Sequence, residues 1–146
     1  MSVAQQSSFF GAVGIDLSGQ RVLVVEDEFL IASYLVDWLR ECGAVVVGPA
    51  ARLGEALLLA KTKPPLDCAL LDIDLQGDMA FPVADALAER GVPFVFLTGY
   101  RQDVIPARYA NVPRYEKPFD HAALMQYLSS VLVVAAATTE ATSAAL

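Results

Sequence analysis

Arg21-Val-Leu-Val-Val-Glu-Asp-Glu28 is the stretch that decides the fold. Its first five residues form a continuous and largely β-branched run, which is typical of a strand buried on both faces of a parallel sheet. From Phe29 to Cys42 the apolar side chains recur at helical spacing, and Gly43 follows as a stop signal. A buried strand that leads directly into a helix is the building unit of an α/β sheet.

The same unit recurs along the chain. Short runs indicate further strands at 44–47, 68–71, 94–97 and 114–116. Helical patterns indicate helices over 53–60 and 79–90, and a last helix that Asp120 caps and that has Leu124, Leu128, Val131 and Leu132 on one face. Between Arg101 and Asn111 the helical pattern is poor and Pro106 interrupts it, so we expect a short or irregular fourth helix. The sequence predicts a (βα)5 doubly wound α/β fold around a parallel five-stranded sheet.

Composition limits the classes of function. The 146 residues are 55% hydrophobic and 18% charged, as expected for one globular domain. A formal net charge of −7 argues against nucleic acid and anionic membranes as partners, because both require clustered basic residues. No apolar run is long enough to span a membrane and no signal-peptide pattern is present, so we expect a cytoplasmic protein. Cys42 and Cys68 lack metal-ligand spacing and indicate small core residues in a reducing compartment.

The two ends of the chain differ from its middle. The first residues lack a sustained apolar pattern, and the last are rich in Ala and Thr. We therefore expect a flexible N-terminal extension over 1–18, one folded domain over 19–134 and a flexible tail over 135–146.

Polar residues whose side chains can take part in chemistry follow four of the predicted strands. Parallel α/β sheets bind ligands at the carboxyl ends of their strands. At these ends the sequence has Glu26, Asp27 and Glu28 after the first strand, Asp72 and Asp74 after the third, Thr98 after the fourth and Lys117 after the fifth. We expect these carboxylates, one hydroxyl and one ammonium to converge on one edge of the sheet.

This set of side chains suits phosphoryl transfer to a carboxylate. Crowded carboxylates repel one another unless a cation binds them. A site with only oxygen ligands suits Mg²⁺, with Mn²⁺ as a substitute, and Mg²⁺ often shares its ligands with phosphate. A carboxylate can attack a phosphoryl group and form an aspartyl phosphate. A lysine and a hydroxyl can then stabilise the phosphoryl oxygens.

Four segments together resemble the receiver domain of bacterial two-component response regulators. They are Val-Leu-Val-Val-Glu26-Asp27-Glu28, Leu-Leu-Asp72-Ile-Asp74-Leu, Phe96-Leu-Thr98-Gly99-Tyr100 and Glu116-Lys117-Pro118-Phe119. The resemblance covers residues 20 to about 132 and implies the flavodoxin-like strand order 2-1-3-4-5. The third segment is also similar to a single-domain subclass with a Phe-Ala-Thr-Gly-x-Tyr signature.

The resemblance implies a role for each site residue. Asp72 would be the phospho-acceptor, Thr98 the switch hydroxyl and Lys117 the lysine that pairs with the phosphoryl group. Asp27 and Asp72 would bind Mg²⁺ directly, Glu26 would act through water, and Asp74 would contribute its backbone carbonyl. The Lys117–Pro118 peptide bond would be cis.

The resemblance also implies how such a protein signals. It would be a phosphoprotein of a two-component phosphorelay rather than an enzyme with its own substrate, catalysing only its own phosphotransfer and dephosphorylation. Its phosphoryl donor would be a sensor histidine kinase, of the HWE type or a related one, or a phosphotransfer protein. Its output would pass to a downstream protein partner, and homodimerisation through the first or last helix stays open.

The sequence departs from the common receiver pattern in one respect. Most receivers have an aromatic residue three positions before the lysine, whereas this chain has Arg114 there and Tyr115 one residue later. A shift of one residue moves a strand side chain to the opposite face, so Tyr115 is not a simple substitute. Tyr100 and Tyr115 are therefore both switch candidates. We expect the segment between Gly99 and Pro113 to be mobile before phosphorylation and to become ordered after it.

Two other classes compete with a phosphorylated receiver. A haloacid-dehalogenase-type phosphatase also uses an Asp-x-Asp motif, here Asp72-Ile-Asp74, but its other metal-binding acids come later in the chain and it usually carries a cap domain. A pseudo-receiver, which acts only by binding, would normally have lost Asp72 or Lys117, and this chain has both.

Overall fold

A computed structural model describes residues 15–62, 65–99 and 105–132. Its centre is a five-stranded sheet in the order β2-β1-β3-β6-β7, and every neighbouring pair of strands is parallel. The strands are β1 (Arg21–Val25), β2 (Val45–Ala50), β3 (Cys68–Asp72), β6 (Phe94–Thr98) and β7 (Arg114–Glu116). This is the predicted strand order and the flavodoxin-like fold. The most buried strand, β3, lies in the centre, as its four apolar residues before Asp72 favour.

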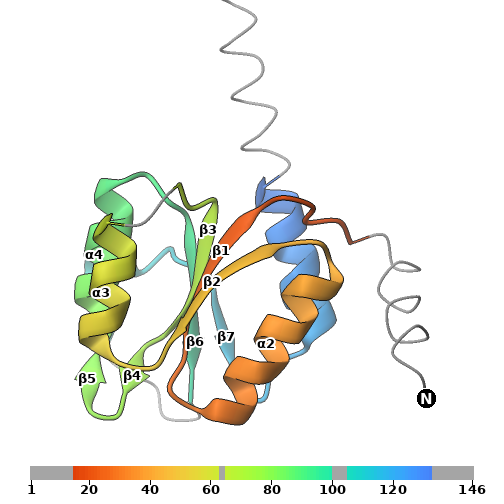
Figure 1. Ribbon diagram of the computed structural model, residues 1–146. Coiled ribbons are helices and arrows are strands. Elements are labelled where there is room, and N and C mark those ends of the chain that lie inside the picture. The colour runs from red at the N-terminus through yellow and green to blue at the C-terminus, as the bar shows by residue number, and fades with distance from the viewer. Residues whose placement is uncertain (1–14, 63–64, 100–104, 133–146) are drawn as a thin grey trace, which may run out of the picture.

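Helices cover both faces of the sheet (Figure 1). On one face lie α3 (Leu53–Thr62) and α4 (Phe81–Glu89). On the other lie α2 (Phe29–Glu41) and a helix formed by residues 121–132. Asp120 caps this last helix as predicted, because its Oδ1 accepts hydrogen bonds from the backbone N–H groups of Ala122 and Ala123. No helix in the described part of the chain is long and apolar enough to cross a bilayer.

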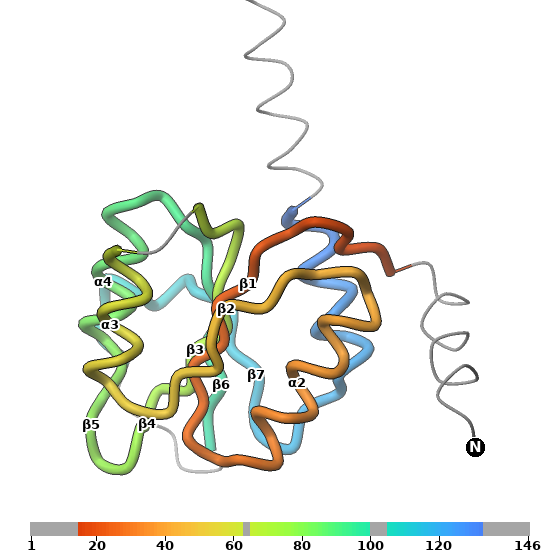
Figure 2. The backbone as a smooth tube through the Cα atoms, viewed as in Figure 1, coloured from red at the N-terminus to blue at the C-terminus, as the bar shows by residue number. Residues whose placement is uncertain are grey.

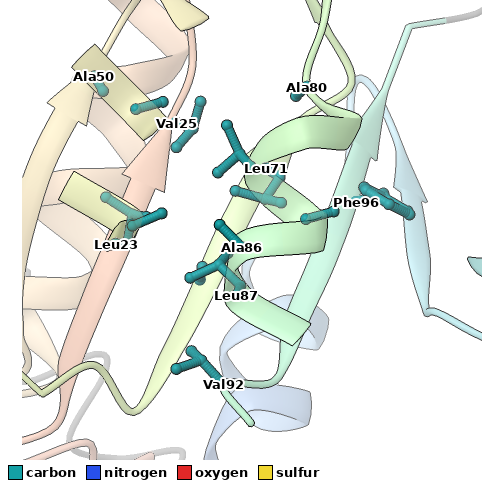
Figure 3. Packing of buried hydrophobic residues seen from close by; sticks show 14 of the residues in the cluster. Leu23, Val25, Ala50, Leu71, Ala80, Ala86, Leu87, Val92 and Phe96 are labelled. Atoms are coloured by element: carbon teal, nitrogen blue, oxygen red, sulfur yellow. The ribbon is translucent and has the colours of Figure 1, made fainter. Parts of the chain in front are cut away.

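Two hydrophobic clusters hold the layers together. The first joins the sheet to α3 and α4 and includes Leu71, Leu87 and Phe96 (Figure 3). The second joins the opposite face to α2 and to residues 121–132 and includes Leu35, Leu70 and Leu128. Cys42 and Cys68 belong to the second cluster and form no disulfide, in line with their prediction as core residues.

The folded body begins earlier than the predicted boundary at residue 19. Ile15 and Leu17 are buried in the second cluster, and the backbone N–H of Leu17 donates to the carbonyl of Cys42. These two apolar residues pack beside the C-terminal end of α2, so residues 15–18 are not a flexible extension. Residues 1–14 and 133–146, which hold the rest of the predicted extension and the tail, lie outside the described residues.

The third predicted helix was placed too early. It begins at Phe81 rather than at residue 79, with Pro82 in its first turn. A small antiparallel hairpin precedes it, formed by β4 (Asp74–Leu75) and β5 (Asp78–Met79). Gln76 and Gly77 make the turn with φ angles of 55° and 94°, the left-handed pair that a tight two-residue hairpin requires. The second strand is also longer than predicted and continues to Ala50.

The segment before β7 is anchored, contrary to our expectation for residues 105–113. Within the described residues 105–113, a 3-10 helix, η1 (Ala107–Tyr109), stands where a short or irregular fourth helix was expected, while residues 101–104 of that prediction lie outside the described residues. Tyr109 is buried, and Ile105 and Val112 pack against the first cluster. The switch candidate Tyr100 lies outside the described residues.

Candidate functional site

The carboxyl ends of the parallel strands meet at one edge of the sheet, at the bottom of the view in Figure 2. The connection from β1 to α2 and the β4–β5 hairpin lie at this edge. The predicted acidic residues of β1 and β3 and Lys117 after β7 are brought together here. Parallel pairing explains the convergence, since it aligns the ends of β1, β3 and β6.

Three carboxylates form the centre of the site. Glu26, Asp27 and Asp72 each offer an oxygen, and these atoms all lie within 4.8 Å of one another. Glu26 is 1% exposed and Asp72 4% exposed, whereas Asp27 is half-buried. Such burial of like charges is unfavourable unless a cation balances them.

Lys117 provides the positive charge that the structure shows at this site. Its Nζ lies 2.8 Å from Glu26 Oε2, 3.1 Å from Asp72 Oδ2 and 3.5 Å from Glu28 Oε1. The lysine side chain is only 11% exposed. The backbone N–H of Lys117 also donates to the carbonyl of Thr98, at 2.7 Å. This bond ties the lysine to the end of β6, and the peptide bond to Pro118 is cis as predicted.

The charges shift one another's pKa values. Burial, a hydrogen bond with Asp27 and the charge of Glu26 together raise the pKa of Asp72 to about 9, although Lys117 opposes the rise. Burial raises the pKa of Glu26 as well, against the hydrogen bond from Lys117. For Lys117, burial favours the neutral amine, but the hydrogen bond to Glu26 and the charge of Asp72 outweigh it and raise the pKa. Burial is the largest cause for both acids, so the site favours their neutral forms while no further cation is bound.

Asp74 lies beside the cluster and its side chain points elsewhere. Its Oδ1 accepts the backbone N–H of Gly77 at 2.7 Å, within the hairpin turn. Its own backbone N–H donates to Asp72 Oδ1 at 3.3 Å. The side chain is thus engaged in the hairpin, and the metal role of the Asp74 main chain stays a prediction.

Comparison with known proteins identifies the family. The profile of the response regulator receiver domain matches residues 22–129. The chain belongs to the response regulator receiver family. Among solved structures, SdrG from Sphingomonas melonis Fr1 is 36% identical with a TM-score of 0.69, over 78% of this chain and 97% of SdrG. The BeF3-activated conformation of SdrG from Pseudomonas melonis Fr1 is likewise 36% identical with a TM-score of 0.64, over 80% of this chain and 98% of that one.

Curated relatives agree with this assignment. The transcriptional regulatory protein PdtaR of Mycobacterium tuberculosis is 36% identical over 104 residues, which are 68% of this chain and 50% of PdtaR. The sensory transduction protein LytT of Bacillus anthracis is 36% identical over 115 residues, which are 74% of this chain and 45% of LytT. The receiver thus spans about half the length of the curated relatives it matches. The receiver family acts in two-component signalling, and this chain belongs to that family.

The acidic pocket of this receiver fits a divalent cation. Receiver domains bind Mg²⁺ at such a pocket, and the donor set here consists of oxygen atoms alone, which Mg²⁺ prefers. Burial, followed by Asp27 and Glu26, raises the pKa of Asp72, so a further cation would favour its charged form. Glu26, Asp27 and Asp72 are the residues whose carboxylates could hold the ion or its water ligands.

The structure separates the switch candidates. Thr98 is 5% exposed at the end of β6, between the strands that lead to Asp72 and Lys117. Tyr115 pairs in register with Leu97, one residue away, and packs with Tyr127 in the second cluster. It therefore lies on the opposite face of the sheet from Thr98, as the one-residue shift indicated. Arg114 is exposed.

An apolar groove borders the receiver's acidic pocket and was not predicted as a site. Its volume is about 200 Å³, and the residues that line it are Ile31, Tyr34, Trp38, Lys117, Pro118 and Phe119. Close by on α2, Phe29 and Leu30 are 81% and 64% exposed. His121 stacks on Trp38 with 4.3 Å between ring centroids. The sequence feature that could have indicated this groove is the apolar stripe of the first helix, which is wider than the stripe of a helix that buries one face.

Proposed function

We propose that this receiver accepts a phosphoryl group on Asp72 in a Mg²⁺-dependent reaction. The observation that carries the proposal is the position of the Asp72 carboxylate. It lies 3.1 Å from the ammonium of Lys117 and within 4.8 Å of the acids Glu26 and Asp27. An oxygen of Asp72 attacks the phosphorus of the donor, a new P–O bond forms, and the bond from phosphorus to the donor breaks.

Each residue of the pocket has a separate role in the proposed phosphotransfer. Lys117 exchanges its contact with the carboxylate of Asp72 for one with the phosphoryl oxygens. Thr98, at the end of the neighbouring strand, supplies a hydroxyl donor to the same oxygens. Mg²⁺, when bound, neutralises part of the phosphoryl charge. Glu26, buried and bonded to Lys117, holds the lysine in place and would act on the ion through water, while the carbonyl of Asp74 would be a further ligand.

The donor is a histidine kinase or a phosphotransfer protein, and α2 supports this proposal. Exposed apolar patches on soluble domains commonly mark protein contacts. The groove beside Lys117 and the exposed Phe29 and Leu30 place such a patch next to the acceptor. A donor that docks there brings its phosphohistidine to Asp72. A kinase of the HWE type fits the Phe96-Leu-Thr98-Gly99-Tyr100 run and the single-domain subclass that it resembles.

The signal leaves through protein contacts in the cytoplasm. We propose that the receiver has no substrate turnover of its own and passes its state to a protein partner, with neither nucleic acid nor a membrane as a direct target. The net charge of −7 supports the last point. The name of PdtaR gives transcriptional regulation as the role of that protein. We do not propose this role for the present receiver, because the match covers only half of PdtaR.

Intact mass measurement with acetyl phosphate tests this function. With Mg²⁺ present, the protein should gain one labile phosphoryl group, and Asp72→Ala should gain none. Absence of any adduct on the unaltered protein would identify a pseudo-receiver and contradict the proposal. Continuous release of phosphate beyond one equivalent, at a rate that does not depend on decay of the adduct, would identify a phosphatase and contradict it as well.

A further inference from the structure

Tyr109 stands out among the tyrosines that the structure describes because it is buried, with 7% of its surface exposed. Its ring packs edge-on against Phe94, at 5.5 Å between centroids, and against Phe96, at 5.9 Å. It comes from η1, at the end of the segment that leads away from Thr98. No step of the proposed phosphotransfer uses Tyr109.

The hydroxyl of Tyr109 contacts a charged side chain. It donates a hydrogen bond to Asp85 Oδ1, from the neighbouring helix α4. Arg108 binds the same carboxylate with two nitrogens, Nε at 3.0 Å and a terminal nitrogen at 3.2 Å, and its guanidinium lies 4.9 Å from the centre of the Tyr109 ring. The hydrogen bond between Tyr109 and Asp85 is called the latch below, and the exposed Arg108 lies beside it. The hydrogen bond from Tyr109 and then those from Arg108 lower the pKa of Asp85, so its carboxylate is charged at neutral pH.

Packed aromatic rings connect the latch to the phosphorylation site. Phe96 is fully buried and lies on β6 two residues before Thr98, on the same face of the sheet. Besides Tyr109, its ring contacts Phe81 at the start of α4, at 6.0 Å between centroids. The end of β6 is bonded on both sides, since Leu97 accepts the N–H of Ile73 and Thr98 accepts that of Lys117. A shift of the strand end therefore moves Phe96 against Tyr109.

We propose that Tyr109 and Asp85 are positioning residues of the phosphorylation response, and that their hydrogen bond holds the unphosphorylated arrangement of β6 and η1. The contacts of Lys117 identify the arrangement seen here as the unphosphorylated one. Its ammonium binds the carboxylates of Asp72 and Glu26, and a phosphoryl group on Asp72 would draw it away from the Asp72 carboxylate. Phosphorylation then pulls Thr98 and Lys117 together at the end of β6, Phe96 moves, and the ring of Tyr109 repacks.

The direction of the effect follows from linkage. A contact that exists in only one of two states favours that state by the free energy of the contact. Close-packed rings do not deform continuously, so the ring of Tyr109 has two discrete positions rather than a graded shift. Breaking the latch removes a contact from the unphosphorylated state alone. The acceptor then binds a phosphoryl mimic more tightly, although the protein itself is less stable.

Titration with beryllofluoride in excess Mg²⁺ tests the proposal, which rests on the proposed phosphorylation of Asp72. Tyr109→Phe keeps the ring and removes the hydroxyl. It should tighten beryllofluoride binding about fivefold, the effect of one hydrogen bond of ordinary strength. Asp85→Ala should tighten it to a similar extent, and the double variant should not exceed the stronger single one. Hydrogen exchange at residues 105–112 should be faster in the unaltered protein with beryllofluoride than without it, and already fast in Tyr109→Phe.

Two control variants separate this role from a structural one. Tyr127→Phe removes a hydroxyl from the other face of the sheet, and Arg108→Gln breaks the exposed ion pair while Tyr109 and Asp85 stay in place. Both should change beryllofluoride affinity less than twofold. If Tyr109→Phe lowers the melting temperature but leaves beryllofluoride affinity unchanged or weakens it, the latch does not oppose phosphorylation and the proposal is wrong. If the unaltered protein binds no beryllofluoride, the proposed function fails and the latch role fails with it.

Discussion

The ammonium of Lys117 lies 3.1 Å from Asp72 Oδ2, although 45 positions separate the two residues in the chain. The same ammonium also contacts two glutamates, one buried and one exposed. Within the part of the chain that the structure describes, Lys117 is the cation that contacts these clustered acids. The contact between Lys117 and Asp72 therefore links the chemistry of the site to the stability of the fold, and the predictions that follow use this link.

Lys117→Ala should destabilise the metal-free protein by about 3–5 kcal/mol, the usual effect of removing one partner of a buried ion pair. The remaining carboxylates would lose their counter-charge. Urea unfolding at neutral pH with EDTA measures the change. Saturating Mg²⁺ should restore part of the loss, since the ion supplies positive charge to the same oxygens. A free energy of unfolding within 1 kcal/mol of the unaltered protein would show that the pocket does not depend on Lys117.

Asp72→Ala should have the opposite effect on stability while abolishing phosphorylation. It removes one of three crowded acids, so we expect the metal-free protein to gain about 1–4 kcal/mol. Phosphorylation by acetyl phosphate, followed by intact mass, should fall to zero. Asp74→Ala is the matched control, because its side chain is bound in the hairpin turn and not in the cluster. If Asp72→Ala is still phosphorylated and Asp74→Ala is not, the phospho-acceptor is Asp74.

Phosphotransfer should require Mg²⁺ or Mn²⁺. Asp27→Ala should slow it more than Glu26→Ala, because we assign direct coordination to Asp27 and contact through water to Glu26. Initial rates with acetyl phosphate at several Mg²⁺ concentrations separate a lost metal affinity from a lost maximal rate. Unchanged rates in excess EDTA would refute the metal requirement for the unaltered protein.

Much of this site could be predicted from the sequence because strand ends are local features. Asp72 follows four apolar residues of a buried strand, and Lys117 follows a short strand and precedes a proline, so each position could be read without knowledge of the other. The rule that parallel strands end at one edge then brings them together. What the sequence does not show is the number of contacts that Lys117 makes, which depends on side-chain geometry.

The features that escaped prediction depend on long-range packing or on unusual backbone angles. Leu17 lies in a stretch without periodicity, and it is buried only because the chain turns back toward Cys42. The β4–β5 hairpin depends on Gln76, a residue type that rarely adopts a positive φ. Tyr109 is a single aromatic residue among helix breakers, and its partner Asp85 is 24 positions away. None of these has a repeating pattern that a sequence could reveal.

The stability of the metal-free protein should fall as the pH rises from about 4 to about 9. The pKa of Asp72 is raised from 3.8 to about 9 by burial, by Asp27 and by Glu26. In this range the folded state holds a proton that the unfolded chain has released, so each rise in pH favours unfolding. Above about 9 both states are ionised at Asp72 and this contribution becomes constant.

Melting temperatures measured in EDTA from pH 5 to pH 9 test this trend, and Asp72→Ala is the control that should flatten it. Mg²⁺ competes with the proton on Asp72, so the affinity for Mg²⁺ should rise with pH over the same range. A slope that is identical in the unaltered protein and in Asp72→Ala would assign the pH dependence to other groups.

The exposed apolar side chains of α2 should matter for a protein donor and not for a small one. Leu30 is 64% exposed beside the groove that borders Lys117, and Leu58 is 59% exposed on α3, on the opposite face of the sheet. Leu30→Ser should slow phosphotransfer from the cognate histidine kinase by about tenfold, because it removes apolar contact area that only a docked protein uses. The rate with acetyl phosphate should stay within twofold of the unaltered protein. Leu58→Ser, which removes a side chain of the same type and exposure, should change neither rate. Equal slowing by both variants would show a general loss of stability, and an unaffected kinase rate in Leu30→Ser would place the donor on another face of the receiver.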